Sequence, residues 1–301
     1  MRSRRAGKIH KNLWYLGREE SGIYLLEGKA SSLIISGGMS YLAPVIHKQI
    51  LDFGIDETRL GKLLILHAHF DHVGLVPFFK RRYPELELYA SARAWEILQM
   101  TKGIETINTF SHLVAERLGH AEHLKGMDLQ WRDGISGVEV SEGSTIDLGG
   151  TIVEILETPG HSSCSVSAYV PEIRALFPSD GGGIPYGETI IPSGNSNFTR
   201  YQQSLAKLSN LAVDILCADH YGYVMGQEAE CYIARSIDCA AETRSVIEEL
   251  FRRTGSLDAT VNALVDDTYA RNPDYFLAPE ITAGIYRQTV RHIARELEEK
   301  S

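Results

Sequence analysis

The chain has 301 residues, a length at the border between one large domain and two small ones, and it can bury a substantial core. Its formal net charge of −9 argues against a general nucleic-acid binder, because such proteins need a cationic face to displace counterions from phosphates. No run reaches the about 18 apolar residues of a membrane span, so the sequence predicts a cytoplasmic protein without a membrane partner.

The first 70 residues predict a β-β-β-α-β order. Short apolar runs at 13–16, 23–26 and 33–35 are separated by glycine turns, which is typical of an antiparallel meander. Apolar side chains recur every three or four residues over 42–53 and predict an amphipathic helix. The apolar run 63–66 predicts a buried strand.

The segment His67-Ala68-His69-Phe70-Asp71-His72 directly follows that strand and concentrates metal-ligand groups. In an extended loop, alternate side chains point to the same side, so His67, His69 and Asp71 are expected to converge while His72 faces elsewhere. One ion would leave one ligand unused, whereas two adjacent ions could take His67 with His69 and Asp71 with His72. The segment therefore predicts a dinuclear metal site; the alternative is a polar turn with surface histidines.

Further ligand candidates follow later strands. We expect inserted helices at about 91–127, strands between 138 and 177, a helix at 198–211 and a strand at 213–217. His161, Asp180 and His220 each lie just past a strand, so five histidines and two aspartates from four loops could meet at one sheet edge. Beyond residue 226 the pattern is helical, at 228–253, 257–269 and 279–299, which predicts a catalytic domain over 1–226 and a helical region over 227–301.

Across roughly residues 8–225 the chain resembles the metallo-β-lactamase superfamily. The motifs that carry the resemblance occur in the family's order: His67-x-His69-x-Asp71-His72, Gly160-His161, Ser179-Asp180 and Asp219-His220-x-Gly222. The resemblance implies an α/β fold of the αβ/βα type, with two mixed β-sheets packed face to face, outer helices and the metal site at one edge, followed here by a C-terminal helical extension.

The resemblance also implies the ligand roles. The first ion would take His67, His69 and His161, the second would take Asp71, His72 and His220, and Asp180 would bridge them. The histidine at position 69 resembles the motif of hydrolytic branches such as glyoxalase II. Oxygen reductases of the superfamily have glutamate at this position, so a redox role is disfavoured. The chain departs from many members at Ser36-Gly37-Gly38, where they have an aspartate-containing turn, and at Asp219-His220-Tyr221-Gly222, where Gly-His-Gly is usual.

Within the superfamily, three short features resemble the PqsE-type quinolone-response thioesterases. They are Gly37-Gly38, His72-x-Gly74-Leu75-x-Pro77 and Phe276-Leu277-x-x-Glu280. In such proteins the C-terminal helices cover the metal pocket. The helices over 227–301 are thus expected to form a lid, a homodimer interface or both.

The expected function is hydrolysis of a small acyl compound, most readily an anionic thioester, by a hydroxide that bridges two divalent ions, with Asp71 orienting the water. Zinc is the first expectation for the metal, and iron or manganese suit the same ligands. The basic run Lys80-Arg81-Arg82 could meet the phosphates of a coenzyme A carrier or form a solvated helix face. The alternatives are a phosphodiesterase or lactonase on the same site, or a regulatory protein that acts through protein contacts.

Overall fold

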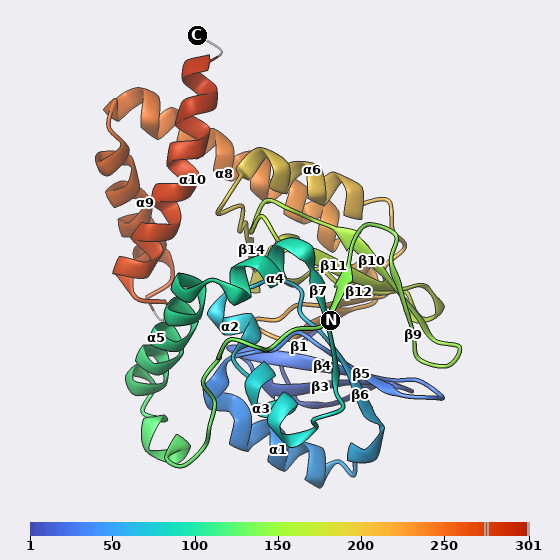
Figure 1. Cartoon of the computed structure of the whole chain (residues 1–301). Helices are drawn as coiled ribbons and strands as arrows, with labels where there is room; N and C mark the ends of the chain where they lie inside the picture. The colour runs from blue at the N-terminus through green and yellow to red at the C-terminus, as the bar shows by residue number, and fades with distance from the viewer. Residues whose placement is uncertain (274, 276, 300–301) are drawn as a thin grey trace. The chain divides into compact units, whose positions relative to one another are not determined.

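The computed structural model describes residues 1–273, 275 and 277–299 (Figure 1). Phe276, from the third PqsE-like feature, lies outside the described residues. By their contacts the described residues form two compact units. The first comprises Met1–Glu157, Cys164–Asp180 and Ala212–Glu230, and the second comprises Thr158–Ser163, Gly181–Leu211 and the described residues from Cys231 onward. The domain boundary after residue 226 stays a prediction.

One seven-stranded sheet of the first unit is built from the N-terminal part of the chain. Its order is β2-β3-β4-β5-β6-β7-β8. The strands β3, β4 and β5 pair antiparallel, which confirms the predicted meander, and β5 to β8 pair parallel through helical crossovers. The strand bounds are β2 Gly7–His10, β3 Leu13–Arg18, β4 Ser21–Glu27, β5 Ser32–Ile35, β6 Leu60–Leu64, β7 Glu87–Ser91 and β8 Val138–Val140.

The second seven-stranded sheet is also mixed and has the order β1-β16-β15-β12-β11-β10-β9. Only β12 and β15 pair parallel, and each neighbouring pair otherwise runs antiparallel. The strand bounds are β1 Arg2–Ser3, β9 Thr145–Asp147, β10 Ile152–Glu157, β11 Val166–Val170, β12 Ala175–Phe177, β15 Ile215–Cys217 and β16 Tyr223–Met225.

The two sheets share one apolar core, to which both contribute inward-facing side chains. Tyr24 of the first sheet meets Phe177 of the second edge to face, with ring centroids 5.3 Å apart. Strand β10 shows the expected alternation, because Val153 and Ile155 are buried in this core whereas Ile152 is 37% exposed. The two mixed sheets with their helices confirm the predicted fold class.

The helices of the first unit include the predicted helix before the metal-ligand segment and the predicted insertion. Their bounds are α1 Ala43–Asp52, α2 Phe70–Val73, α3 Val76–Arg82, α4 Ala92–Gln99, α5 Thr101–Arg117 and α7 Gln227–Glu230. The expectation of an extended loop over residues 67–71 is wrong beyond His69. Helix α2 begins at Phe70, and Asp71 lies in its first turn, where the helix dipole favours a carboxylate.

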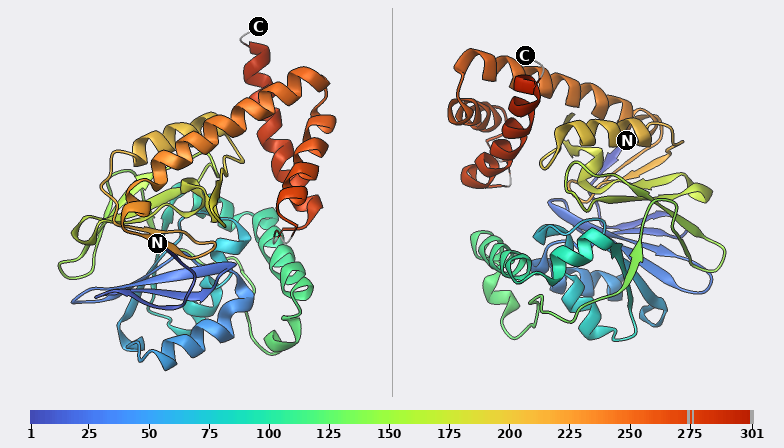
Figure 2. Two further views of the ribbon diagram at one scale, coloured as in Figure 1. Left: turned by 180° about the vertical axis from the view of Figure 1, so that it is seen from behind. Right: turned by 45° about the horizontal axis from the view of Figure 1, so that its top comes forward.

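The second unit holds the predicted C-terminal helices and a short hairpin. Helix α9 packs against both α8 and α10, and Figure 2 shows α9 and α10 side by side. No helix among the described residues is long and apolar enough to cross a membrane. The bounds are β13 Ile184–Tyr186, β14 Thr189–Ile191, α6 Phe198–Leu208, α8 Tyr232–Thr254, α9 Leu257–Arg271 and α10 Pro279–Glu299.

Candidate metal centre

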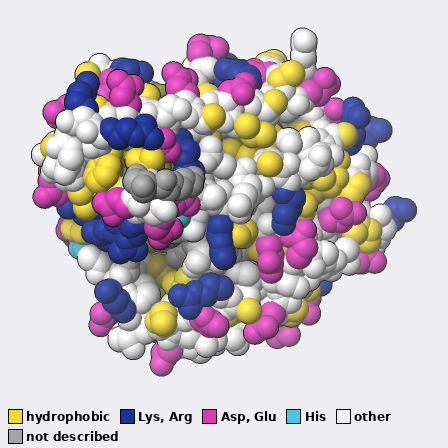
Figure 3. Space-filling model, turned by 90° about the horizontal axis from the view of Figure 1, so that it is seen from above, with side chains coloured by type: hydrophobic (Ala, Val, Ile, Leu, Met, Phe, Trp, Pro, Cys, Tyr) yellow, Lys and Arg dark blue, Asp and Glu magenta, His cyan; other side chains and the backbone are white. Residues whose placement is uncertain are grey.

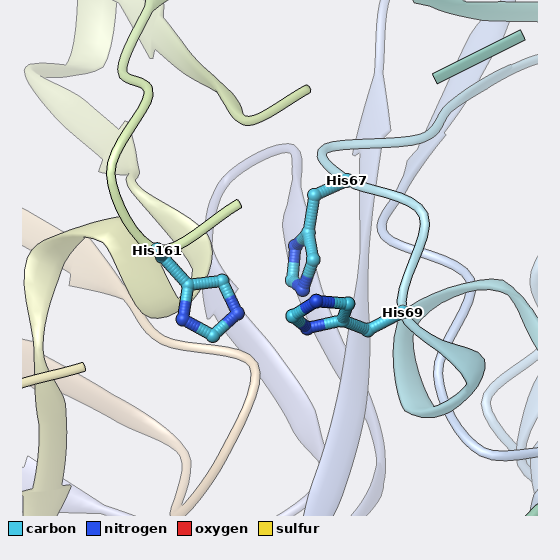
Figure 4. A group of neighbouring side chains, drawn as sticks. All are labelled: His67, His69 and His161. Atoms are coloured by element: carbon cyan, nitrogen blue, oxygen red, sulfur yellow. The ribbon is translucent and has the colours of Figure 1, made fainter. Parts of the chain in front are cut away.

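Three of the predicted ligands form a first histidine group. The imidazoles of His67, His69 and His161 each offer a ring nitrogen, and these nitrogens lie within 4.8 Å of one another (Figure 4). His67 and His161 are buried, and His69 is partly exposed. Such a triad matches the number and kind of ligands that hold a divalent transition metal in an open site.

A second group brings together Asp71, His72 and His220. The Nε2 atoms of His72 and His220 lie 3.2 Å apart, and Asp71 Oδ2 is 3.6 Å from the first and 3.5 Å from the second. Asp180 completes a third group with His67 and His72, one residue from each of the other two groups. The predicted ligands thus fall into the grouping expected from the resemblance, and their individual roles stay predictions.

Two imidazoles are held in the tautomer in which Nε2 can bind a metal. Nδ1 of His220 lies 2.6 Å from the carbonyl oxygen of Glu20, and Nδ1 of His161 lies 2.8 Å from that of Ser193. Because a carbonyl oxygen only accepts, each Nδ1 carries the hydrogen, which leaves the lone pair of the neutral ring on Nε2. Ligating histidines characteristically donate their other N–H in this way, so the donor set fits metal ions.

His72 and His67 are supported by side chains instead. Nδ1 of His72 lies 2.8 Å from Asp219 Oδ2, and Nδ1 of His67 lies 3.2 Å from the hydroxyl of Ser179. The same hydroxyl donates to Asp219 Oδ2 over 2.5 Å. Asp219 and Ser179 are buried, and the Oδ1 atom of Asp219 accepts no hydrogen bond from the described residues. A buried carboxylate satisfied at one oxygen is stabilised by nearby positive charge, which ions in this cluster would provide.

The charges of the second group are strongly coupled. Burial opposes ionisation of Asp71, but the adjacent His72 holds the pKa of that carboxyl well below its usual value. Burial disfavours the charged form of His72, yet the carboxylates of Asp180 and Asp71 raise the pKa of its imidazole well above the ordinary value. The pKa of His220 is raised by the same carboxylates against the effect of burial. Without metal, the cluster therefore balances its carboxylates with protons on imidazoles.

Metal binding is expected to displace those protons. Because the pKa values of His72 and His220 are raised and a ligand imidazole must be neutral, zinc binding at pH 7 releases protons, and the apparent affinity falls as the pH falls. Calorimetric titration of metal-free protein in buffers of different ionisation enthalpy measures the number released. A binding enthalpy independent of the buffer would contradict the proton-filled cluster.

Backbone contacts hold the metal-ligand helix α2 against the turn after β5. The N–H of Gly37 donates to the carbonyl of His72, and the N–H of Gly74 donates to the carbonyl of Gly38. A Cβ at Gly37 would lie 2.7 Å from the carbonyl oxygen of His72, and one at Gly74 would lie 2.4 Å from the N atom of Ser40. Two of the PqsE-like features thus contact each other, and their glycines allow this close approach.

The loop that carries His220 is anchored from the first sheet. The buried hydroxyl of Tyr24 lies 2.6 Å from the carbonyl oxygen of Ala218 and 3.0 Å from that of Gly222. Replacing Tyr24 by phenylalanine leaves both carbonyls without this donor, so we expect the free energy of unfolding to fall by about 1–3 kcal/mol. Urea denaturation measures this change, and an unchanged midpoint would show that the hydroxyl does not anchor the loop.

The groups that support the ligands leave little signal in the sequence. Ser179 and Asp219 lie within the family motifs, and Glu20 acts through a carbonyl oxygen that any residue would provide. Ser193 contacts Nδ1 of His161 with its carbonyl oxygen at 2.8 Å and with its hydroxyl oxygen at 2.9 Å. The one available signal was the departure at Asp219, which places a carboxylate beside His220. Ser36, where many members have an aspartate-containing turn, has a buried hydroxyl with no hydrogen-bond partner among the described residues.

The fold and the clustered ligands together define a class, that of metal-dependent hydrolases built on two mixed sheets. The chain belongs to the metallo-β-lactamase superfamily, whose sequence profile matches residues 17–220. A hydroxyacylglutathione hydrolase of Methylococcus capsulatus is 26% identical over 274 residues, which cover 87% of this chain and 84% of that protein. A metallo-β-lactamase fold-containing protein of Sulfurisphaera tokodaii is 26% identical over 208 residues, 68% of this chain and 74% of that protein.

Among solved structures, a metallo-β-lactamase family protein from Thermus thermophilus superimposes with a TM-score of 0.69. The match covers 97% of this chain and 95% of that one at 14% sequence identity. The fold is therefore shared over nearly the whole chain, including the C-terminal helices.

Proposed function

We propose that this protein is a dinuclear metallohydrolase that cleaves the thioester of a small acyl compound. The observation that carries the proposal is the convergence of five imidazoles and two carboxylates in three overlapping ligand groups. The relative from Methylococcus capsulatus, a hydroxyacylglutathione hydrolase by name, supports the thioester class, because an acyl group on glutathione is bound through sulfur.

The proposed roles follow from the donor set. His67, His69 and His161 would hold one divalent ion, Asp71, His72 and His220 would hold a second, and Asp180 would contribute to both. Two such ions, zinc first among the candidates, lower the pKa of water and polarise a carbonyl oxygen.

This chain's own residues prepare the site for that chemistry. The carboxylate of Asp71 stays ionised, is 12% exposed, and is the proposed acceptor that orients the attacking water. The buried hydrogen bonds of His72 and His220 fix their rings and keep each Nε2 directed at the cluster. A thioester suits this arrangement because a thiolate leaves without obligatory protonation.

The basic run after the metal-ligand segment gives no support to a coenzyme A carrier. Lys80 donates to the carbonyls of Pro84 and Leu86, and Arg81 donates to those of Asp128 and Gln130. These side chains stabilise the local fold, so a coenzyme A phosphate would compete with intramolecular hydrogen bonds there. A compact acyl thioester, such as one carried on a small peptide thiol, is the preferred substrate class.

The surface view is in keeping with a small substrate. On the face that Figure 3 shows, lysine and arginine side chains are interspersed with aspartate and glutamate. Among the described residues on this face no unbroken basic track is seen that would follow a polyanion. The resemblance to the PqsE-type thioesterases belongs to the same proposal, with the C-terminal helices α8–α10 as lid or dimer interface.

A substrate panel tests the proposal. Zinc-loaded protein is assayed on acyl-glutathione and acyl-coenzyme A thioesters, on lactones and on bis-p-nitrophenyl phosphate, and kcat/KM is compared between classes. We expect the thioesters to be preferred, the glutathione thioester most. A higher kcat/KM for the phosphodiester or for a lactone would refute the thioester proposal in favour of that substrate class. Absence of hydrolysis in every class would favour a regulatory protein.

A further inference from the structure

A single buried carboxylate oxygen connects the supports of two predicted ligands that belong to different ions. Asp219 Oδ2 lies 2.8 Å from Nδ1 of His72 and 2.5 Å from the hydroxyl oxygen of Ser179. The hydroxyl oxygen in turn lies 3.2 Å from Nδ1 of His67. All four side chains are at most 2% exposed, so water does not compete with these contacts.

The direction of each hydrogen bond follows from chemistry. An ionised carboxylate only accepts, so the hydroxyl proton of Ser179 points to Asp219, and the hydroxyl oxygen is left to accept from His67. His72 donates its Nδ1–H to the same carboxylate. Both rings therefore keep the Nε2 lone pair for a metal, and both depend on one atom for their orientation.

We propose that Ser179 and Asp219 couple the two metal positions, so that the two ions bind cooperatively. The inference rests on the dinuclear site of the proposed function and goes beyond its ligands. An ion on His67 makes the Nδ1–H of that ring more acidic and strengthens the chain to Asp219, which fixes the carboxylate where it also receives the Nδ1–H of His72. Filling the first position thus organises a ligand of the second.

Two further observations favour a dedicated support. Ser179 has a left-handed backbone with φ of 49°, a conformation that a serine adopts at a cost, directly before the predicted ligand Asp180. The Oδ1 atom of Asp219 is buried and accepts no hydrogen bond from the described residues. The hydrogen bonds of this carboxylate are therefore those that Oδ2 makes to Ser179 and His72. Both residues have positioning roles.

The test measures metal binding without any substrate. Metal-free protein competes with a chromophoric chelator for Zn²⁺, and Co²⁺ absorption spectra report the ligand environment of each ion. The variants are Asp219→Asn, which keeps the size and removes the charge, and Ser179→Gly, which adopts the left-handed backbone without strain and removes the hydroxyl. Asp214→Asn is the matched control, because Asp214 precedes the same strand β15 that Asp219 follows, and pairs with Arg174 at the surface.

We expect the natural protein to take up two ions in one cooperative step. Asp219→Asn should weaken both ions by about 10- to 100-fold, and Ser179→Gly should separate uptake into two steps with an altered first Co²⁺ spectrum, while Asp214→Asn binds as the natural protein does. Two-ion cooperative uptake in folded Asp219→Asn and in Ser179→Gly would overturn the inference. If Asp219→Asn fails to fold by circular dichroism, Ser179→Gly decides alone. A natural protein that binds two ions but cleaves no thioester would leave this coupling intact and refute only the substrate proposal.

Discussion

Asp180→Ala protein is expected to lose thioester hydrolysis by on the order of 10³-fold in kcat and to retain fewer than two metal ions per chain. The carboxylate lies 3.4 Å from Nε2 of His72 and 3.7 Å from Nε2 of His220, and it forms a ligand group with His67. Its removal takes a negative charge from a cluster that must hold two dications. Elemental analysis and steady-state kinetics on the same preparation measure both effects.

The matched control is Asp133→Ala, because Asp133 is exposed in the same unit and belongs to none of the ligand groups found among the described residues. We expect it to keep the metal content and the rate. An Asp180→Ala protein with two ions and the unchanged rate would exclude Asp180 from the site.

The largest effect on stability is expected from Ile155→Ala, at about 2–5 kcal/mol of the free energy of unfolding. Ile155 lies in β10 and is 1% exposed within the core that the two sheets share. Truncation removes apolar contact and leaves a cavity that the rigid sheets on both sides fill only in part. Denaturation in urea, followed by circular dichroism, gives the difference.

Ile152→Ala in the same strand is the control for residue type and for strand propensity. Ile152 is 37% exposed and points away from the shared core, so we expect a change of less than about 1 kcal/mol. Equal losses for the two variants would contradict the placement of the core between the sheets.

The sequence predicted the larger elements of the fold because their patterns are long. The helices α8 and α10 carry apolar periodicity over several turns, and the strands β3, β4 and β5 alternate with glycine turns. Strands of two or three residues, such as β1, β9 and β16, are too short to show a period and form through pairing with their neighbours.

The candidate ligands were recognisable because imidazole and carboxylate groups occurred at strand ends. Side-chain alternation does not explain how Asp71 comes to lie beside His220, because Asp71 faces His220 from the first turn of helix α2. A change from extended loop to helix within two residues leaves little local signal. The assignment of Asp71 and His220 to the same ion came from the resemblance to the superfamily and not from side-chain alternation.

The residues that hydrogen-bond the ligand imidazoles could not be predicted from the sequence, because these contacts depend on tertiary structure. Glu20 contributes a carbonyl oxygen, which is the same in every residue type, and Ser193 contributes its carbonyl oxygen together with its hydroxyl oxygen. Asp219 acts on His72 across 147 residues of sequence, a relation that only the folded chain establishes. At position 36 the chain has serine where many members have an aspartate-containing turn, and at position 219 it has an aspartate that contacts His72. The sequence alone does not relate these two differences to the site.

Two metal ions are expected to bind within the cluster of imidazoles and carboxylates. Anomalous diffraction at the zinc absorption edge, from crystals of zinc-loaded protein, tests it most directly. We predict two anomalous peaks, one bound by His67, His69 and His161 and the other by Asp71, His72 and His220. A single peak, or peaks away from these side chains, would exclude the dinuclear site.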